Sequence, residues 1–276
     1  MTIDAHHHFW KYDPAEYDWI SEEMSGLRRD FLPENLEREA ALAGVDGVVS
    51  VQARQTLEET GWLLDMASAS ALVWGVVGWV PLAAPDVGRS LEVFSGNPKF
   101  KGVRHVVQGE PDEKFLERED FQAGIRELSR FGLVYDILIF ERQLPQAISF
   151  VDRHPDQPFV LDHVAKPRIK DREFEPWNSR IRELAKREHV TCKISGMVTE
   201  ADWLCWDAGQ LRPYFETVLE AFGPGRLMFG SDWPVCLLGT GYGQWLGIVK
   251  EFLAGLSESE RNMVLGGTAE RVYFPA

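Results

Sequence analysis

The stretch PENLEREAALAGVDGVVSVQA, residues 33–53, places an amphipathic helix directly before a strand. Pro33 stands near the first helical position and Gly44 just past the last one, which is the usual asymmetry of helix ends. The β-branched run that follows, 45–53, is typical of a strand. Strands that alternate with helices in this way build parallel α/β sheets, so the recurrence of this unit along the chain decides the fold.

The same alternation recurs from one end of the chain to the other. Eight strands are predicted, at 2–9, 45–53, 72–80, 100–108, 132–138, 158–165, 190–196 and 226–233. Helices are predicted at 33–44, 56–69, 86–95, 121–132, 144–155, 178–188, 211–223 and 244–256, with a last short helix after Ser257. Thr56 with Glu59 and Ser257 with Glu260 each predict a capping box.

Eight such units over 276 residues predict a (β/α)8 TIM barrel of the α/β class, with residues 1–276 forming a single domain. An open doubly wound sheet is the alternative. That fold usually carries a glycine-rich turn after its first strand, and the sequence has no GxGxxG there and no P-loop.

Composition narrows the class of partner. There are 29 basic and 43 acidic residues, a net charge of −14 that repels phosphate backbones, so neither nucleic acid nor an anionic membrane is expected as a partner. The three cysteines are widely spaced, which is typical of a reduced, cytoplasmic protein. No apolar run reaches the roughly 18 residues of a membrane helix, and no secretory signal precedes the first strand.

One connection is long. Residues 10–32 carry no helical stripe, and a loop of this length in a globular domain is usually functional or disordered. The aromatic residues in it favour order. We therefore predict a lid or a pocket wall after the first strand.

Three histidines follow one another in the first predicted strand, in the run DAHHHFW. A purification tag would be longer and set in a Gly/Ser linker, so they are assigned to the protein. Alternate side chains of a strand share a face, which places Asp4, His6 and His8 together. A His-x-His pair on one face indicates a metal-ligand or acid–base site.

In a barrel the chemistry lies where the strands end, at the carboxyl face. Four of the seven histidines, at positions 6, 8, 105 and 163, fall near predicted strand ends. Other polar residues at these ends include Gln52, Arg54, Arg104, Tyr135, Asp136, Asp162, Lys166, Lys193, Ser195, Ser231 and Asp232. Each has a structural explanation of its own, but together they indicate an active site.

The motifs DAHHHFW, GVRHVVQ, LDHVAKP, KISG, FGSDWP and GGTAERVYF resemble those of the amidohydrolase superfamily. The resemblance is to its amidohydrolase-2 branch, and within it to lactonases of sugar acids, and it runs from residue 3 to about residue 274. His-x-His alone would be a weak signal; the ordered set at these separations is specific.

The resemblance implies roles for four residues. His6 and His8 match the strand-1 metal ligands, His163 the strand-6 histidine, and Asp232 the aspartate that activates water. Superfamily sites usually add a strand-5 histidine, which is missing here, so a two-metal centre is not expected. One divalent ion held by His6, His8 and Asp232 or His163 suits zinc. Members of the branch can work without a metal, so the ion is not an essential part of the prediction; no organic cofactor is expected.

The remaining roles are hypotheses about an ester hydrolase. Asp232 takes the proton of the attacking water, and His105 or His163 protonates the leaving oxygen. Substrate contacts are assigned to charged and aromatic side chains near the strand ends, namely Arg54, Arg104, Lys166, Trp10, Trp79, Trp203 and Trp233.

The predicted function is hydrolysis of a small-molecule sugar lactone, L-fucono-1,5-lactone or a similar L-fucono, D-arabinono or L-galactono lactone, in carbohydrate catabolism such as fucose degradation. A lactonase for a pyrone dicarboxylate is the main alternative, since two carboxylates could be bound by Arg54, Arg104, Lys166 and Arg168. A metal-dependent decarboxylase of the same superfamily and a sugar-binding barrel without turnover are further alternatives. The sequence is compatible with a homo-oligomer.

Overall fold

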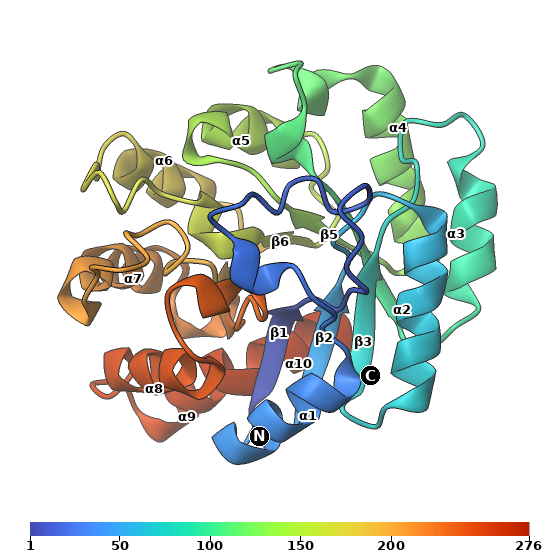
Figure 1. Ribbon diagram of the computed structural model, residues 1–276. Helices are drawn as coiled ribbons and strands as arrows, with labels where there is room; N and C mark the ends of the chain where they lie inside the picture. Colours follow the sequence, from blue (N-terminus) through green and yellow to red (C-terminus); the bar gives the residue numbers. More distant parts are fainter. Residues whose placement is uncertain (276) are drawn as a thin grey trace.

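Eight parallel strands form one sheet in the computed structural model, which describes residues 1–275. Their spatial order follows the chain from β1 to β8 (Figure 1). The strands are β1 (Ile3–His7), β2 (Gly47–Val51), β3 (Val73–Gly78), β4 (Phe100–His105), β5 (Val134–Ile137), β6 (Phe159–Leu161), β7 (Val190–Ile194) and β8 (Leu227–Phe229). Each lies inside its predicted range.

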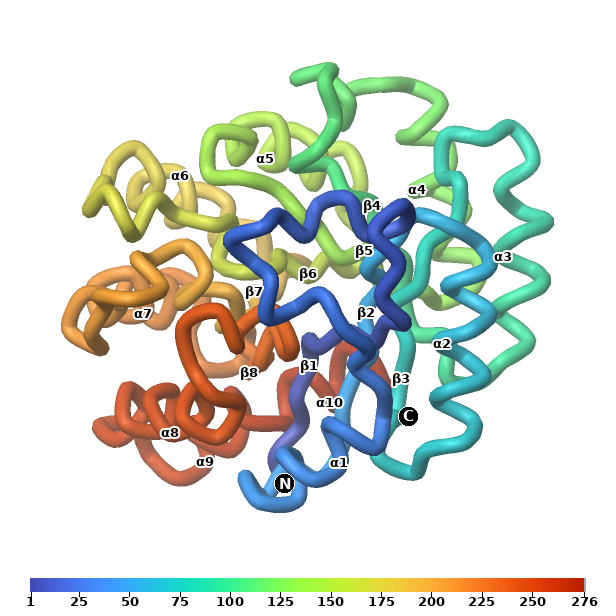
Figure 2. Tube along the Cα trace, viewed as in Figure 1, coloured from blue at the N-terminus to red at the C-terminus, as the bar shows by residue number. Residues whose placement is uncertain are grey.

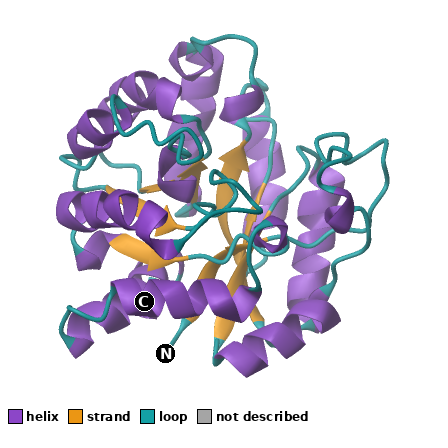
Figure 3. Cartoon of the chain, turned by 60° about the vertical axis from the view of Figure 1, so that its left-hand side comes forward, coloured by secondary structure: helices purple, strands orange, loops and turns teal. Residues whose placement is uncertain are grey.

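Helices surround the strands, as the cartoon coloured by secondary structure shows (Figure 3). They are α1 (Pro33–Ala43), α2 (Leu57–Ala69), α3 (Val87–Ser95), α4 (Glu119–Leu128), α5 (Leu144–Asp152), α6 (Trp177–Leu184), α7 (Ala208–Phe222), α8 (Tyr242–Phe252), α9 (Glu258–Asn262) and α10 (Thr268–Tyr273). Strand order and helix placement confirm the predicted (β/α)8 barrel. The assignment of residues 1–276 to a single domain stays a prediction.

The two capping boxes have different outcomes. Ser257 and Glu260 form one at the start of α9. The Thr56 hydroxyl accepts the Glu59 N–H across 3.1 Å, but the Glu59 carboxylate does not return to Thr56. It accepts the N–H groups of Ala53 and Arg54 instead. Glu59 is fully buried. Its carboxylate accepts backbone N–H groups of the loop after β2 that would otherwise have no hydrogen-bond partner.

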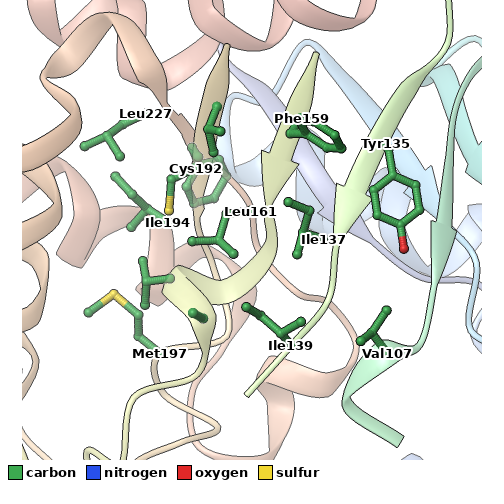
Figure 4. Close-up of a cluster of buried hydrophobic side chains, with 14 of the residues drawn as sticks. Val107, Tyr135, Ile137, Ile139, Phe159, Leu161, Cys192, Ile194, Met197 and Leu227 are labelled. Atoms are coloured by element: carbon green, nitrogen blue, oxygen red, sulfur yellow. The ribbon is translucent and has the colours of Figure 1, made fainter. Parts of the chain in front are cut away.

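The barrel closes between its first and last strands. Beyond β8 the chain pairs with β1 through a parallel bridge between His7 and Trp233, and the His8 N–H donates to the Trp233 carbonyl across 2.7 Å. Outside the sheet, apolar side chains of neighbouring strands form a continuous layer under the helices, which Figure 4 shows for Ile137, Leu161 and Ile194. The closed sheet and this layer fix the positions of the strand ends.

The long connection after β1 is ordered. Trp10 and Phe31 pair across it as a short antiparallel bridge, and Tyr17, Ile20 and Leu27 are buried. The chain trace in Figures 1 and 2 shows this segment, in blue, passing over the end of the barrel. No helix within residues 1–275 has the length and apolar character needed to cross a membrane.

Candidate active site

His6 in β1 and His8, the residue directly after this strand, lie on one face, as the alternation of extended backbone predicts. Their Nε2 atoms lie 3.2 Å apart. The His8 Nδ1 is 2.8 Å from the Val51 carbonyl, so this nitrogen carries a proton and donates it. Below them, Asp4 accepts the backbone N–H of His6 at 3.1 Å and of Ser231 at 2.8 Å. Asp4 therefore ties the first strand to the end of β8.

Asp232 follows β8 and meets these imidazoles. Its N–H donates to the His6 carbonyl across 2.8 Å, and its φ of 58° lies in the left-handed region. Its Oδ1 lies 3.5 Å from His8 Nε2, 3.8 Å from His6 Nε2 and 3.9 Å from His163 Nε2. A carboxylate near the end of the chain thus contacts histidines from its start.

After β6 the chain forms a left-handed turn, residues 163–166, in which four consecutive non-glycine residues have φ between 48° and 60°. The Lys166 N–H donates to the His163 carbonyl across 2.8 Å. The Trp177 indole donates to the Val164 carbonyl across 2.8 Å. Left-handed geometry costs about 1–2 kcal/mol per residue, so tertiary contacts must hold the turn in place.

His163 is held from β7. Its Nδ1 lies 2.9 Å from the Ser195 hydroxyl, which leaves Nε2 facing Asp232. Gly196 has a φ of +64°, and a Cβ there would lie 2.5 Å from the His163 Nδ1 atom. The glycine of the KISG motif is therefore required both by its backbone conformation and by the ring packed against it.

The donor atoms of His6, His8 and Asp232 fit one divalent ion. Tetrahedral ligands at about 2.0–2.1 Å from zinc lie about 3.4 Å apart, and the three separations here are 3.2, 3.5 and 3.8 Å. Because His8 is protonated on Nδ1, its Nε2 lone pair points at another nitrogen and a carboxylate. A cation between them removes that repulsion. A second group of donors, His6, Asp162 and His163, lies beside the first.

Burial and charge set the protonation states. Burial lowers the pKa of His163 to about 4 against the opposing effect of Asp232. Burial also lowers the pKa of His6 well below its usual value. Burial disfavours the ionised form of Asp232, but His163, His8 and Lys166 outweigh it and hold its pKa below the ordinary value. At neutral pH the imidazoles of His6 and His163 are therefore neutral and Asp232 is a carboxylate.

A cavity of about 740 Å³ opens over these groups. Of the residues assigned to the site from sequence, it is lined by His8, Arg54, Arg104, His163, Lys166, Trp203 and Asp232. His6 lies behind His8 and Asp232, fully buried. The long connection after β1 contributes Glu16, Asp18, Trp19 and Met24 to the wall, which agrees with its predicted role.

Besides His6, four predicted site residues of the described chain are not part of the lining of this cavity. The Trp10 indole donates to the Leu27 and Arg29 carbonyls inside the long connection. Trp233 packs edge-on against Phe31. The other two contact each other: the Trp79 indole donates to His105 Nδ1 across 3.3 Å, and the His105 Nε2 lies 2.6 Å from Glu110. These side chains are engaged in internal contacts, and composition could not separate them from pocket residues.

Other lining residues were missed from sequence. Gln108 follows β4, and its buried Oε1 has no hydrogen-bond partner among the described residues. Glu200, in the loop after β7, lies 3.8 Å from the Lys166 ammonium. Glu16, in the long connection after β1, forms an ion pair with Arg54. All three stand in the connections between strands and α-helices, whose path no periodicity reveals.

Beneath the site, the barrel interior holds buried charges. Arg104 Nη1 lies 3.0 Å from Asp162, and its second nitrogen donates to the Gln52 carbonyl. Lys193 lies between Asp136 and Asp162, with its Nζ 3.2 Å from His6 Nδ1. The network places a carboxylate and an ammonium against the far side of the His6 ring.

Comparison with known proteins gives matches over nearly the whole chain. The family profile described as "Amidohydrolase" matches residues 3–274. The chain is 41% identical to the L-fucono-1,5-lactonase of Burkholderia multivorans, covering 99% of this chain and 96% of that one. It is 36% identical to the L-fucono-1,5-lactonase of Burkholderia ambifaria, covering 99% and 95%.

A solved structure agrees in detail. The crystal structure of an amidohydrolase from Burkholderia multivorans with bound zinc superposes with a TM-score of 0.94 at 42% identity, covering 99% of each chain. Family profile, sequence identity, barrel and His/Asp cluster lead to one conclusion: the chain belongs to the amidohydrolase family.

Proposed function

We propose that this chain is a lactonase that opens an aldonolactone, L-fucono-1,5-lactone or a similar L-fucono, D-arabinono or L-galactono lactone, to the aldonic acid. The observation that carries the proposal is the position of Asp232, which lies in the wall of a cavity large enough for a sugar, 3.5–3.9 Å from three imidazoles. The 41% identity to an L-fucono-1,5-lactonase supports the choice of sugar.

Asp232 would activate the water. Its Oδ1 faces the three imidazoles, so Oδ2 is the oxygen assigned to the proton of the attacking water. A pKa below the ordinary value keeps the carboxylate ionised at neutral pH, as a base requires. The oxygen of the water then attacks the lactone carbonyl carbon.

The negative charge that develops on the carbonyl oxygen needs a donor. The His163 Nε2 faces the cavity side of the site, while its Nδ1 is occupied by the Ser195 hydroxyl. A neutral imidazole that accepts from Ser195 carries its proton on Nε2, and this N–H can stabilise the oxyanion. When bound to His6, His8 and Asp232, a zinc ion would polarise the water or the carbonyl.

The charges in the cavity favour a neutral substrate over a pyrone dicarboxylate. Binding two carboxylates calls for guanidinium groups with free donors. Arg54 already pairs with Glu16, and Arg104 with Asp162 and the Gln52 carbonyl. The acidic residues Glu16, Asp18 and Glu200 in the wall would repel a dianion. A sugar lactone presents hydroxyl groups, which both acidic and basic side chains can bind.

A panel of lactones tests the proposal. Proton release at neutral pH should show turnover of L-fucono-, D-arabinono- and L-galactono-lactones, with little on 2-pyrone-4,6-dicarboxylate. Preference for the dicarboxylate would favour the alternative, and binding without turnover of any lactone would refute the enzyme. We further propose that the protein acts in the cytoplasm in carbohydrate catabolism; size-exclusion chromatography with light scattering would test for a homo-oligomer.

A further inference from the structure

We propose that Lys166 donates the proton to the leaving ring oxygen of the lactone and that Glu200 is the residue that positions it. This inference rests on the proposed lactonase function and concerns the second half of the reaction, when the carbon–oxygen bond of the ring breaks. The sequence assigned that proton to His105 or His163. The structure commits both histidines to other partners.

The two histidines are excluded for different reasons. His105 is turned toward Glu110 and Trp79 and is not part of the cavity wall within the described chain. His163 does line the cavity, but its Nδ1 lies 2.9 Å from the Ser195 hydroxyl and its Nε2 faces Asp232 at 3.9 Å. The proposed mechanism already uses the Nε2–H group for the carbonyl oxyanion, so this group is not free to protonate the ring oxygen.

The arginines of the cavity are also excluded as acids. A guanidinium does not lose its proton in proteins. Arg54 and Arg104 are moreover occupied by Glu16 and by Asp162. His8 also lines the cavity, but its Nδ1–H donates to the Val51 carbonyl across 2.8 Å. Among the described basic side chains that line the cavity, this leaves the Lys166 ammonium. An ordinary lysine ammonium is a stronger acid than a sugar hydroxyl, so transfer to a departing alkoxide is favourable.

The left-handed turn and two neighbouring side chains position the Lys166 ammonium. Lys166 and His163 lie in the same wall of the cavity. They are three residues apart in the left-handed turn, which is closed by the hydrogen bond from the Lys166 N–H to the His163 carbonyl. The Nζ atom lies 5.6 Å from the centre of the Phe140 ring and 3.8 Å from Glu200 Oε1. The second distance is longer than a hydrogen bond, so the N–H groups remain available to a substrate. Glu200 thus orients the ammonium by charge without occupying its protons.

The step balances. Asp232 takes one proton from water, and the hydroxide oxygen forms a bond to the carbonyl carbon. When the carbonyl re-forms, the bond from that carbon to the ring oxygen breaks. Its electron pair stays on the ring oxygen, which takes a proton from Lys166 Nζ. The proton held by Asp232 returns to the lysine amine through water, and the new carboxylic acid ionises into solvent. One water is consumed, and both side chains regain their initial states.

Oxygen exchange separates this role from substrate binding. In H₂¹⁸O, a tetrahedral intermediate that cannot expel its ring oxygen reverts and leaves ¹⁸O in the recovered lactone. The variants are Lys166→Arg, which keeps the charge, and Lys166→Met, which removes it. Lys170→Met is the matched control, because Lys170 is an exposed lysine of the same loop. Melting temperatures confirm folding, and a sample without enzyme corrects for spontaneous exchange.

We expect both Lys166 variants to hydrolyse the lactone about 10²-fold more slowly or worse, with a higher ratio of ¹⁸O exchange to hydrolysis than wild type. Glu200→Gln should raise the ratio of exchange to hydrolysis less than either Lys166 variant does. Near-native hydrolysis by Lys166→Arg, or equal loss of hydrolysis and exchange, would overturn the inference and leave Asp232 to deliver the proton itself. A wild type that opens no lactone refutes the proposed function instead, which is a distinct outcome.

Discussion

The ammonium nitrogen of Lys193 lies 3.0 Å from Oδ1 of Asp162, with both side chains fully buried inside the barrel. Lys193 also contacts Asp136, whose two carboxylate oxygens accept the Tyr273 hydroxyl at 2.9 Å. Buried charges are tolerated only when they are paired and hydrogen-bonded. We therefore expect the buried charged groups of the barrel to stabilise one another. Removing one of them should lower the free energy of unfolding.

Replacing Lys193 by Met should lower the free energy of unfolding by about 3–5 kcal/mol, because Asp136 then loses its cationic partner. Urea denaturation at pH 7 measures the loss. The double variant Asp136→Asn/Lys193→Met removes the unpaired carboxylate and should recover part of the stability. A double variant no more stable than the single one would contradict this account of the network.

Glu59 predicts a dependence of stability on pH. Burial raises its pKa from 4.5 to about 7, against the backbone N–H groups and Arg54, which lower it. The folded chain therefore holds the proton more tightly than the unfolded chain. The bound proton of Glu59 contributes about 3 kcal/mol to the free energy of unfolding. This contribution is present below about pH 4.5 and is lost as the pH rises to about 7.

Glu59→Gln removes that titration. Urea denaturation of wild type and variant between pH 4.5 and 7.5 isolates it, because other groups cancel in the difference. We expect the free energy of unfolding of Glu59→Gln to increase relative to that of wild type as the pH rises. A constant difference across this range would show that Glu59 titrates alike in both states.

The proposed ion site predicts metal content. His8→Asn removes one of three ligands and should lower zinc stoichiometry and affinity by at least 10-fold, measured by metal analysis after dialysis against dipicolinate. His189→Asn is the matched control, since the His189 Nε2 lies 3.2 Å from the Val151 carbonyl, away from the site. Equal zinc in wild type and His8→Asn would place any bound ion elsewhere.

Asp232→Asn keeps the size of the side chain but removes the base. The ratio kcat/KM for the aldonolactone should fall by about 10²–10⁴. Titration of released protons at fixed pH measures the rate, and the melting temperature shows that the variant is folded. If the variant keeps near-native kcat/KM, another group activates the water.

Strand and helix positions were predictable because they depend on local periodicity. Each strand lies inside its predicted range, and Asp232, His6, His8 and His163 come together because the closed sheet brings the strand ends to one face. These positions could be predicted because the strands of the barrel follow one another around the ring in the order of the chain.

Which aromatic and loop residues line the cavity was not predictable. Trp203 lines the cavity while Trp10 packs inside the long connection, and nothing in the local pattern of either distinguishes them. Glu200 and Gln108 stand in loops whose conformation depends on tertiary contacts. Glu59 resembles half of a capping box but turns to other amides, because the loop after β2 competes for its carboxylate.

The left-handed turn has a consequence for how the protein becomes an enzyme. Residues 163–166 favour right-handed conformations in an isolated chain, so their arrangement can form only after Trp177, Ser195 and the neighbouring strands are in place. We therefore expect the catalytic centre to form late in folding. A partly loosened barrel would keep much of its secondary structure while losing turnover, so that inactivation on warming precedes the global melt.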